Sequence, residues 1–258
     1  MHVQRVRPRA IVRRPTRRIS EGEVTHIDRV PLDVDLGLQQ HASYLALLGE
    51  IGVELIHAPE TDDHPDGVFV EDTLVMVDGR AIIMRPGAVS RRGETATVKS
   101  LIRTLGISMS EITEGTIDGG DVLAVGSFVF IGLTTRTNQA AIDQFAAFVK
   151  PLGRTTVSVE VPGCLHLKTA ITALPDNTLI GVEGWYDPGA FVDAGFTIHR
   201  ARESSGGDVL CIGSTVVLPA DAPLTGEYVA SLGFGVRHVD VSELQKIEAG
   251  VTCMSVLL

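Results

Sequence analysis

The chain has 258 residues, which is enough to bury a large apolar core in one domain or in two smaller ones. Its 44% of apolar and 21% of charged residues are typical of a globular protein, and no apolar run is long enough to span a bilayer. The net charge of −10 argues against nucleic acid as a partner and is compatible with a cationic small molecule.

The arginine-rich beginning of the chain contains a short apolar stretch, Arg9–Arg13, which predicts a strand with solvated arginines at its ends. It lacks the apolar segment and the small-residue cleavage site of a secretory signal. The three cysteines, Cys164, Cys211 and Cys253, show no paired spacing. This pattern argues against a disulfide framework and for a reducing compartment, so we expect a cytoplasmic protein. No spacing typical of a metal site is present, and we expect no metal or organic cofactor.

Two near-identical segments of nine residues, Gly119–Ser127 and Gly206–Ser214, recur along the chain. Each lies in a longer unit that comprises a polar cluster, an apolar strand, a tight turn, a second strand, a helix and a further strand. A unit that recurs in this way indicates that one supersecondary module is repeated around an axis or along a line.

The elements expected in chain order follow this pattern. The predicted helices are Leu38–Leu48, Glu94–Leu105, Asn138–Leu152, Pro188–Ala194 and Thr225–Leu232. The predicted strands that follow the helices are Val53–His57, Ser108–Ile112, Thr155–Glu160, Phe196–Arg200 and Val236–Asp240. The clearest predicted hairpin joins Thr73–Val77 to Arg80–Arg85 through Asp78-Gly79.

The last module is incomplete, because it begins near Thr252 and ends with the chain at Leu258. The strand Arg9–Arg13 and the helix Leu38–Leu48 would complete it, and pairing the two ends would remove exposed sheet edges. The sequence therefore predicts an α/β fold, a closed five-module pseudo-symmetric propeller of ββαβ repeats around a central pocket. Residues 1–258 would form a single catalytic domain, as a monomer or a homodimer.

In such a ring the entrances of the first strands meet at the centre. The reactive residues at these entrances are Glu71, Asp72, Asp118, His166, Asp208 and Cys253. A cysteine must ionise to attack, a histidine can exchange protons with a leaving amine, and a carboxylate can orient that histidine. Further carboxylates disfavour a thiolate unless the substrate is a cation. A planar guanidinium fits them, which points to attack on a guanidinium carbon.

The chain resembles the dimethylarginine dimethylaminohydrolase family of the guanidine-modifying (amidinotransferase/deiminase) superfamily over essentially its whole length. The matching stretches are Asp66–Asp72, Arg85–Glu94, Gly115–Val122, Gly132–Asn138, Leu165–Thr169 and Gly250–Ser255. The resemblance implies that Cys253 is the nucleophile, that His166 is the general acid and base, and that Asp118 is the acidic partner of His166.

The resemblance also implies a set of positions that contact the substrate. Asp72, with Glu71 beside it, would hold the guanidinium, and Arg91 and Arg136 would bind the α-carboxylate. Asp66 and the backbone at Ile247 match further contact positions. A lid near Glu21–Thr25 would close over the substrate, with Val24 at the place of an aliphatic residue in relatives.

The reaction implied is hydrolysis of Nω-methylated L-arginine to L-citrulline and a methylamine through a covalent thiouronium. An alternative is another guanidine or ureido hydrolase, such as an arginine or agmatine deiminase or a citrulline hydrolase. A third hypothesis is a non-catalytic binding module, similar in fold to ribosome anti-association factors. An unusually reactive Cys253 that substrate protects at neutral pH would support an enzyme, whereas inert thiols would support the binding module.

Overall fold

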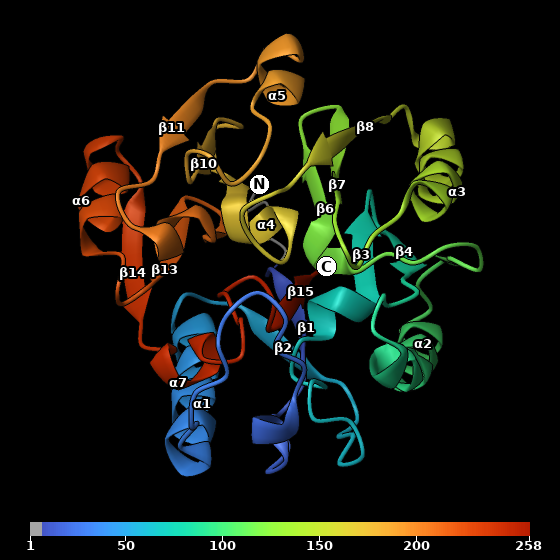
Figure 1. Ribbon diagram of the computed structural model, residues 1–258, viewed down its shortest axis with the longest axis vertical. Coiled ribbons are helices and arrows are strands. Elements are labelled where there is room, and N and C mark those ends of the chain that lie inside the picture. Colours follow the sequence, from blue (N-terminus) through green and yellow to red (C-terminus); the bar gives the residue numbers. More distant parts are fainter. Residues whose placement is uncertain (1–6) are drawn as a thin grey trace, which may run out of the picture.

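Five three-stranded sheets surround one axis in the computed structural model, which describes residues 7–258 (Figure 1). In the order of hydrogen bonding the sheets are β3 (Leu74–Val77), β4 (Arg80–Ile83) and β5 (Met109–Glu111); β6 (Val122–Val125), β7 (Phe128–Leu133) and β8 (Thr155–Glu160); β9 (Ile171–Ala173), β10 (Leu179–Gly181) and β11 (Ile198–Arg200); β12 (Leu210–Ile212), β13 (Thr215–Pro219) and β14 (Gly235–Val239); and β15 (Ser255–Leu257), β1 (Arg9–Val12) and β2 (Glu54–His57). The predicted five-module α/β architecture is confirmed.

Each module has one hairpin and one outer strand. In the β3–β4 hairpin Val77 pairs with Arg80, and the two turn residues between them, Asp78 and Gly79, both have positive φ. This is the backbone that a two-residue hairpin turn requires, and Asp-Gly adopts it readily. The third strand then runs parallel to the second, as the pairing of Ala81 with Met109 shows.

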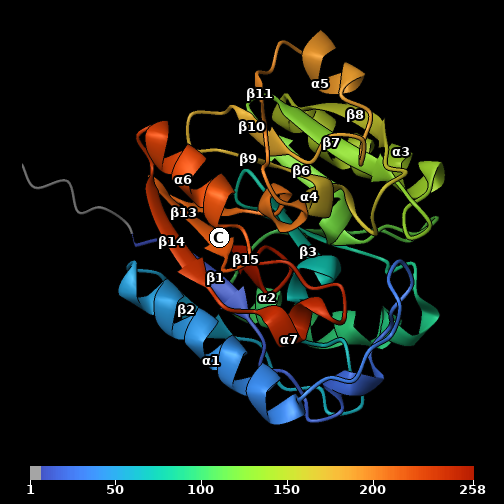
Figure 2. The same cartoon turned by 60° about the vertical axis from the view of Figure 1, so that its left-hand side comes forward.

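The ends of the described chain close the ring. Strand β1 pairs antiparallel with β15, with Ala10 opposite Leu257, and parallel with β2, with Ala10 opposite Leu55. The sheet of the fifth module is therefore assembled from both ends of the chain, as the unpartnered first strand predicted. Figure 2 shows β1 and β15 side by side near the centre of the molecule.

The helices lie outside the strands or between them (Figures 1 and 2). They are α1 (Val34–Glu50), α2 (Thr95–Thr104), α3 (Gln139–Val149), α4 (Leu167–Ala170), α5 (Gly189–Asp193), α6 (Pro223–Ser231) and α7 (Ser242–Gln245). Side-chain caps start two of them, since Asp33 accepts from Leu36 N and Asn138 accepts from Ala141 N. None of the helices in residues 7–258 is long and apolar enough to cross a membrane.

The predicted helices differ from the structure mainly at their ends. The helix expected over Asn138–Leu152 stops at Val149, and a 3₁₀ turn over Lys150–Leu152 ends at the left-handed Gly153. Two short helices, α4 and α7, were not predicted, because four residues carry no helical periodicity. Helix α4 lies near the axis and begins directly after His166, so this small element places a reactive side chain.

Candidate active site

A small cavity lies where the segments that precede the inner strands meet. The residues around Glu23 cover this cavity. Its wall contains Asp66, Asp72, Arg91, Arg136, His166, Ile247 and Cys253, together with Glu23, Phe69, Leu165 and Glu248. Seven of the sequence-predicted site residues therefore come together from distant parts of the chain. The free volume is about 20 Å³, which is room for about one water molecule. In this state the site is closed and its own side chains fill it.

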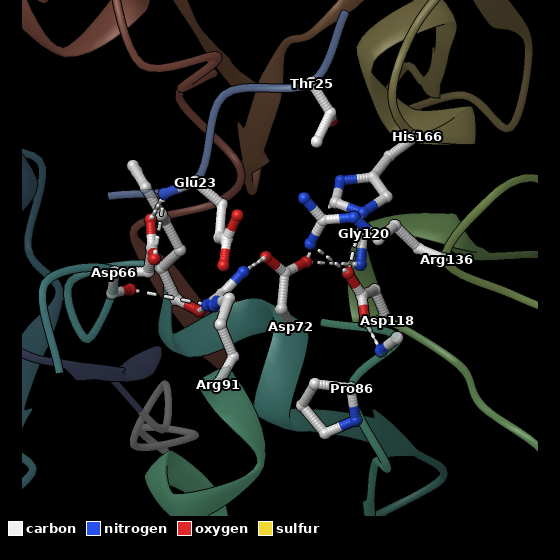
Figure 3. A network of polar contacts seen from close by, with 12 residues as sticks. Glu23, Thr25, Asp66, Asp72, Pro86, Arg91, Asp118, Gly120, Arg136 and His166 are labelled. Carbon is white, nitrogen blue, oxygen red and sulfur yellow. Dashed lines mark hydrogen bonds and ion pairs between the residues drawn. The ribbon is translucent and has the colours of Figure 1, made fainter. Parts of the chain in front are cut away.

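His166 lies between two buried carboxylates (Figure 3). Its Nε2 is 3.0 Å from Asp118 Oδ2, and its Nδ1 is 3.9 Å from Asp72 Oδ1. Burial alone lowers the pKa of His166, but Asp72, Asp121 and Asp118 outweigh it and raise the pKa to about 9. The ring is therefore an imidazolium at neutral pH and can donate a proton.

Asp118 is fully buried and held on both oxygens. Its Oδ1 accepts a hydrogen bond of 2.8 Å from Gly87 N, and its Oδ2 faces both His166 and the Arg136 guanidinium, whose Nη1 is 3.5 Å away. These contacts fix the direction in which Asp118 meets the imidazole ring. The arrangement matches the predicted role of Asp118 as the partner of His166.

Asp72 stands at the centre of the site (Figure 3). Its Oδ2 accepts from Arg91 Nη1 at 2.6 Å, and its Oδ1 accepts from Gly120 N at 3.0 Å. Burial would raise the pKa of Asp72, yet His166 and Arg91 prevail and lower it to about 2. The site thus holds a permanent carboxylate, which suits a cationic ligand.

Arg91 forms an ion pair with the Asp72 carboxylate in the closed site. Its Nε and Nη2 also donate to the two carboxylate oxygens of Glu94, at 3.1 and 3.0 Å. Its Nη2 further contacts the carbonyl oxygens of Asp66 and Phe69. A guanidinium of the protein therefore already pairs with Asp72, and a cationic ligand would have to share Asp72 with Arg91 or displace it.

The residues around Glu23 cover the site as a closed lid. Glu23 N donates to both carboxylate oxygens of Asp66 at 3.1 Å. Thr25 N and His26 N donate to Glu248 at 2.8 and 2.6 Å. Val24 is half-buried, packs against the apolar core and is not part of the cavity wall, so its predicted contact with substrate would require a change of the lid.

Glu71 faces away from the cavity. Its Oε1 is 2.5 Å from Lys168 Nζ, and it lines a second cavity along the axis, bordered by inner strands of all five modules. Adjacent residues of one short turn point in different directions, so Asp72 faces the closed site while Glu71 faces the axial cavity. Burial raises the pKa of Glu71, and Lys168 partly opposes this effect.

The surroundings of Cys253 favour its neutral thiol. Burial raises the pKa of Cys253 well above its usual range, the negative charges of Asp208, Glu71 and Asp72 add to the effect, and a backbone hydrogen bond from Gly250 opposes it. The reactivity of Cys253 at neutral pH, which separates an enzyme from a binding module, therefore depends on what offsets these charges. A cation bound beside Cys253 would offset the carboxylates and allow the thiol to ionise.

This electrostatic arrangement can be tested with two alkylating reagents of the same shape. Neutral 2-chloroacetamide is expected to modify Cys253 slowly at about pH 7, whereas cationic 2-chloroacetamidine should react about 100-fold faster, because its positive charge offsets the field of the nearby carboxylates. Mass spectrometry of digests gives both rates. Burial raises the pKa of Cys164 and of Cys211 to about 12, so these thiols serve as internal controls. Equal rates for the two reagents at Cys253 would contradict the arrangement.

A metal ion is poorly suited to this site. The donor atoms of Asp72, Asp118 and His166 lie within 4.8 Å of one another, as a metal site would require. However, Arg91 and Arg136 already neutralise the two carboxylates, and a protonated imidazole has no lone pair to offer. The geometry favours recognition of an organic cation.

Sequence reasoning missed three residues of the cavity wall, Phe69, Leu165 and Glu248, whereas Glu23 lies within the predicted lid Glu21–Thr25. Glu248 anchors the lid from a loop in which it has a positive φ of 64°, and no local motif marks it. Phe69 lies inside a stretch, Asp66–Asp72, that was singled out, but its aromatic ring alone gave no reason to place it in the site.

Known proteins are similar to this chain over nearly its whole length. The profile of the family described as "Arginine deiminase" matches residues 56–187. The N(G),N(G)-dimethylarginine dimethylaminohydrolase of Streptomyces coelicolor is 44% identical over 97% of this chain and 96% of its own length. Two solved dimethylarginine dimethylaminohydrolases cover 98% of this chain and 100% of theirs at 32% identity. One is a histidine variant as an adduct with S-methyl-L-thiocitrulline, with a TM-score of 0.91. The other is a cysteine-to-serine mutant from Pseudomonas aeruginosa in complex with citrulline, with a TM-score of 0.89.

Proposed function

Because the chain belongs to the dimethylarginine dimethylaminohydrolase family, we propose that it hydrolyses Nω-methylated L-arginine to L-citrulline and methylamine or dimethylamine. The observation that carries the proposal is the closed cavity in which Cys253 and His166 share a wall with the ionised Asp72, while Asp118 contacts His166 from behind that wall. The citrulline complex and the thiocitrulline adduct of relatives support the same substrate class.

Binding uses the charges already described. Asp72 accepts N–H groups of the substrate guanidinium, while Arg91 and Arg136 take the α-carboxylate. Asp66 and the backbone carbonyl of Ile247 provide acceptors for the substrate's ammonium group. Glu71 and Val24 act from outside the present cavity wall, Glu71 through its charge and Val24 through the lid. Arg91 leaves Asp72 as the substrate guanidinium arrives, and this exchange of one guanidinium for another keeps Asp72 paired throughout.

The chemistry proceeds in two displacements. When the substrate cation lies beside Cys253, the thiol loses its proton to solvent, and the thiolate attacks the guanidinium carbon and forms a C–S bond. His166 gives its proton to the methylated nitrogen, and the C–N bond breaks to release the amine. A water molecule then attacks the thiouronium carbon while His166 takes one of its protons. The C–S bond breaks, the proton left on the new hydroxyl passes to solvent, and citrulline and the Cys253 thiolate are released.

Substrate range is tested by incubating the protein separately with asymmetric dimethylarginine, monomethylarginine, arginine, agmatine and citrulline. Ureido product, ammonia and methylamines are assayed in parallel. We expect citrulline with dimethylamine or methylamine from the methylated substrates, and little ammonia from arginine. Ammonia from arginine at a comparable rate would instead favour the second candidate, an arginine deiminase activity, which the matching family profile supports.

Two finer points belong to the same proposal. The free thiols of Cys164, Cys211 and Cys253 support work in the reducing cytoplasm. One chain supplies Cys253, His166 and Asp72 to the same cavity, and we propose a monomer or a homodimer in which each copy carries its own site.

A further inference from the structure

The two Gly-Gly-Asp segments end in buried aspartates that are outside the wall of the active-site cavity. Asp121 is fully buried and Asp208 is 4% exposed. Each precedes the positive-φ glycine of its own hairpin, Gly126 or Gly213, by the same five positions. The two carboxylates are therefore equivalent by the pseudo-symmetry of the fold, and the reaction described above uses neither of them.

Asp121 links three parts of the site. Its Oδ1 accepts from Leu167 N at 2.9 Å, directly after His166 in the chain. Its Oδ2 accepts from Thr137 Oγ1 at 2.6 Å, and the same hydroxyl accepts from Asp118 N at 3.1 Å. One carboxylate therefore fixes the backbone beside His166 and the backbone of its partner Asp118.

Asp208 makes the corresponding contact beside the nucleophile. Its Oδ1 accepts from Thr252 N at 3.0 Å, and its Oδ2 lies 3.4 Å from Thr252 Oγ1. A methyl group on Gly250 would collide with the Asp208 carboxylate, so the backbone leading to Cys253 lies directly against it. Asp208 thereby fixes the chain on the N-terminal side of Cys253.

Both contacts cross from one module to the next. Asp121 precedes β6 and holds the segment before β9, while Asp208 precedes β12 and holds the segment before β15. At the junction between these two pairs a hydroxyl makes the equivalent contact, because Thr172 Oγ1 accepts from Val209 N at 3.1 Å. A carboxylate thus occurs at the two junctions that place His166 and Cys253, and a neutral group suffices at the junction between them.

Burying a carboxylate is costly, and the cost is visible in both residues. Burial raises the pKa of Asp121 to about 6 and that of Asp208 to about 7. Acceptance by a carboxylate shortens and strengthens a hydrogen bond from a backbone N–H. This cost in stability is offset by function if the stronger hydrogen bond holds a catalytic side chain in its place.

We propose that Asp121 and Asp208 are positioning residues for the reaction, Asp121 setting His166 against Asp118 and Asp208 setting the approach of Cys253. The inference rests on the proposed function. The proposal gives the aspartates of the two Gly-Gly-Asp segments a role in catalysis in addition to their place in the scaffold.

The test compares alanine and asparagine at both positions, because asparagine keeps an acceptor oxygen and removes the charge. Asp121→Ala and Asp208→Ala are expected to lower kcat on asymmetric dimethylarginine by about 100-fold, as misplacement of reacting groups does, with KM changed less than about 3-fold. Asp121→Asn and Asp208→Asn should recover kcat to within about 5-fold of the parent protein. Thermal unfolding is recorded for every variant.

Glu203→Ala is the matched control. Glu203 also accepts from two backbone N–H groups of the next segment, Leu224 N at 2.7 Å and Thr225 N at 2.9 Å, but no catalytic side chain follows them. Its loss should lower the unfolding temperature and leave kcat within about 2-fold of the parent.

Folded alanine variants that keep the parent kcat would overturn the inference, as would asparagine variants that lose as much as alanine. If an alanine variant does not fold, Thr137→Val tests the link between Asp121 and Asp118 alone. Thr137→Val should lower kcat about 10-fold, and Thr137→Ser should restore kcat. An unchanged kcat in Thr137→Val would contradict the inference.

A parent protein without turnover would refute the proposed function instead. In that case slower alkylation of Cys253 by 2-chloroacetamidine in Asp208→Ala than in Asp208→Asn would still support the positioning role, and equal rates would contradict it.

Discussion

Replacement of Cys253 by alanine is expected to lower kcat on asymmetric dimethylarginine by about 10⁴-fold or more while the protein stays folded. In the proposed mechanism the thiolate forms the C–S bond in the first displacement and leaves in the second, and no other thiol lies in the cavity wall. Citrulline formation gives the rate. Because the residues proposed to bind the ligand, Asp72, Arg91 and Arg136, are unchanged, calorimetry should show that the variant still binds citrulline.

Cys211→Ala is the control for loss of a buried thiol. Cys211 lies in β12, where its Sγ contacts the carbonyl oxygen of Ala173 on the neighbouring module. Its removal should leave kcat within about 3-fold of the parent. Turnover by Cys253→Ala at the parent rate would show that the reaction does not pass through a thiouronium on Cys253.

Replacement of His166 by alanine should lower kcat by about 10³-fold, because the departing amine then leaves without a positioned proton. Added imidazole should restore part of the rate, since the lost ring leaves a space between Asp118 and Asp72 that a free imidazole can enter. The measurement is kcat with and without imidazole. Undiminished activity in His166→Ala would assign the proton transfers to another group.

The pH dependence of the parent gives an independent check on the same residue. The pKa of His166 is raised to about 9, so the imidazolium is present below this pH and is lost as the pH rises through it. Above this pH the general acid is lost while the Cys253 thiol continues to ionise, so kcat/KM should stop rising near about pH 9. A profile that keeps rising through this range would contradict the assignment of His166 as the acid.

Much of the architecture could be predicted because the same module recurs. The strand near Arg9–Arg13 had no hairpin partner, and this imbalance was sufficient to predict the closure that the pairing of β1 with β15 confirms. Helices with a regular apolar stripe were located to within a few residues. The four-residue helix α4 could not be found in this way, because its start depends on Leu167 N meeting Asp121 from another module.

The residues of the site were easier to name than to orient. Asp118 and His166 were expected to be partners, and they lie 3.0 Å apart. Glu71 and Asp72 were expected to act side by side, but the backbone turns them to different cavities. The bond from Arg91 to Asp72 was also missed, because these two residues were predicted to hold opposite ends of a substrate and the structure pairs them with each other.

The closing pair of strands also bears on how the protein could be rebuilt. Because Ala10 lies opposite Leu257, a short linker between the two ends would disturb little of the structure. New termini could then be opened in an exposed inter-module loop such as the one around Glu114, which produces a circular permutant with the same ring. In such a chain Cys253 would lie far from either end. A tag or a fused domain could then be attached without extending the strand that follows the nucleophile.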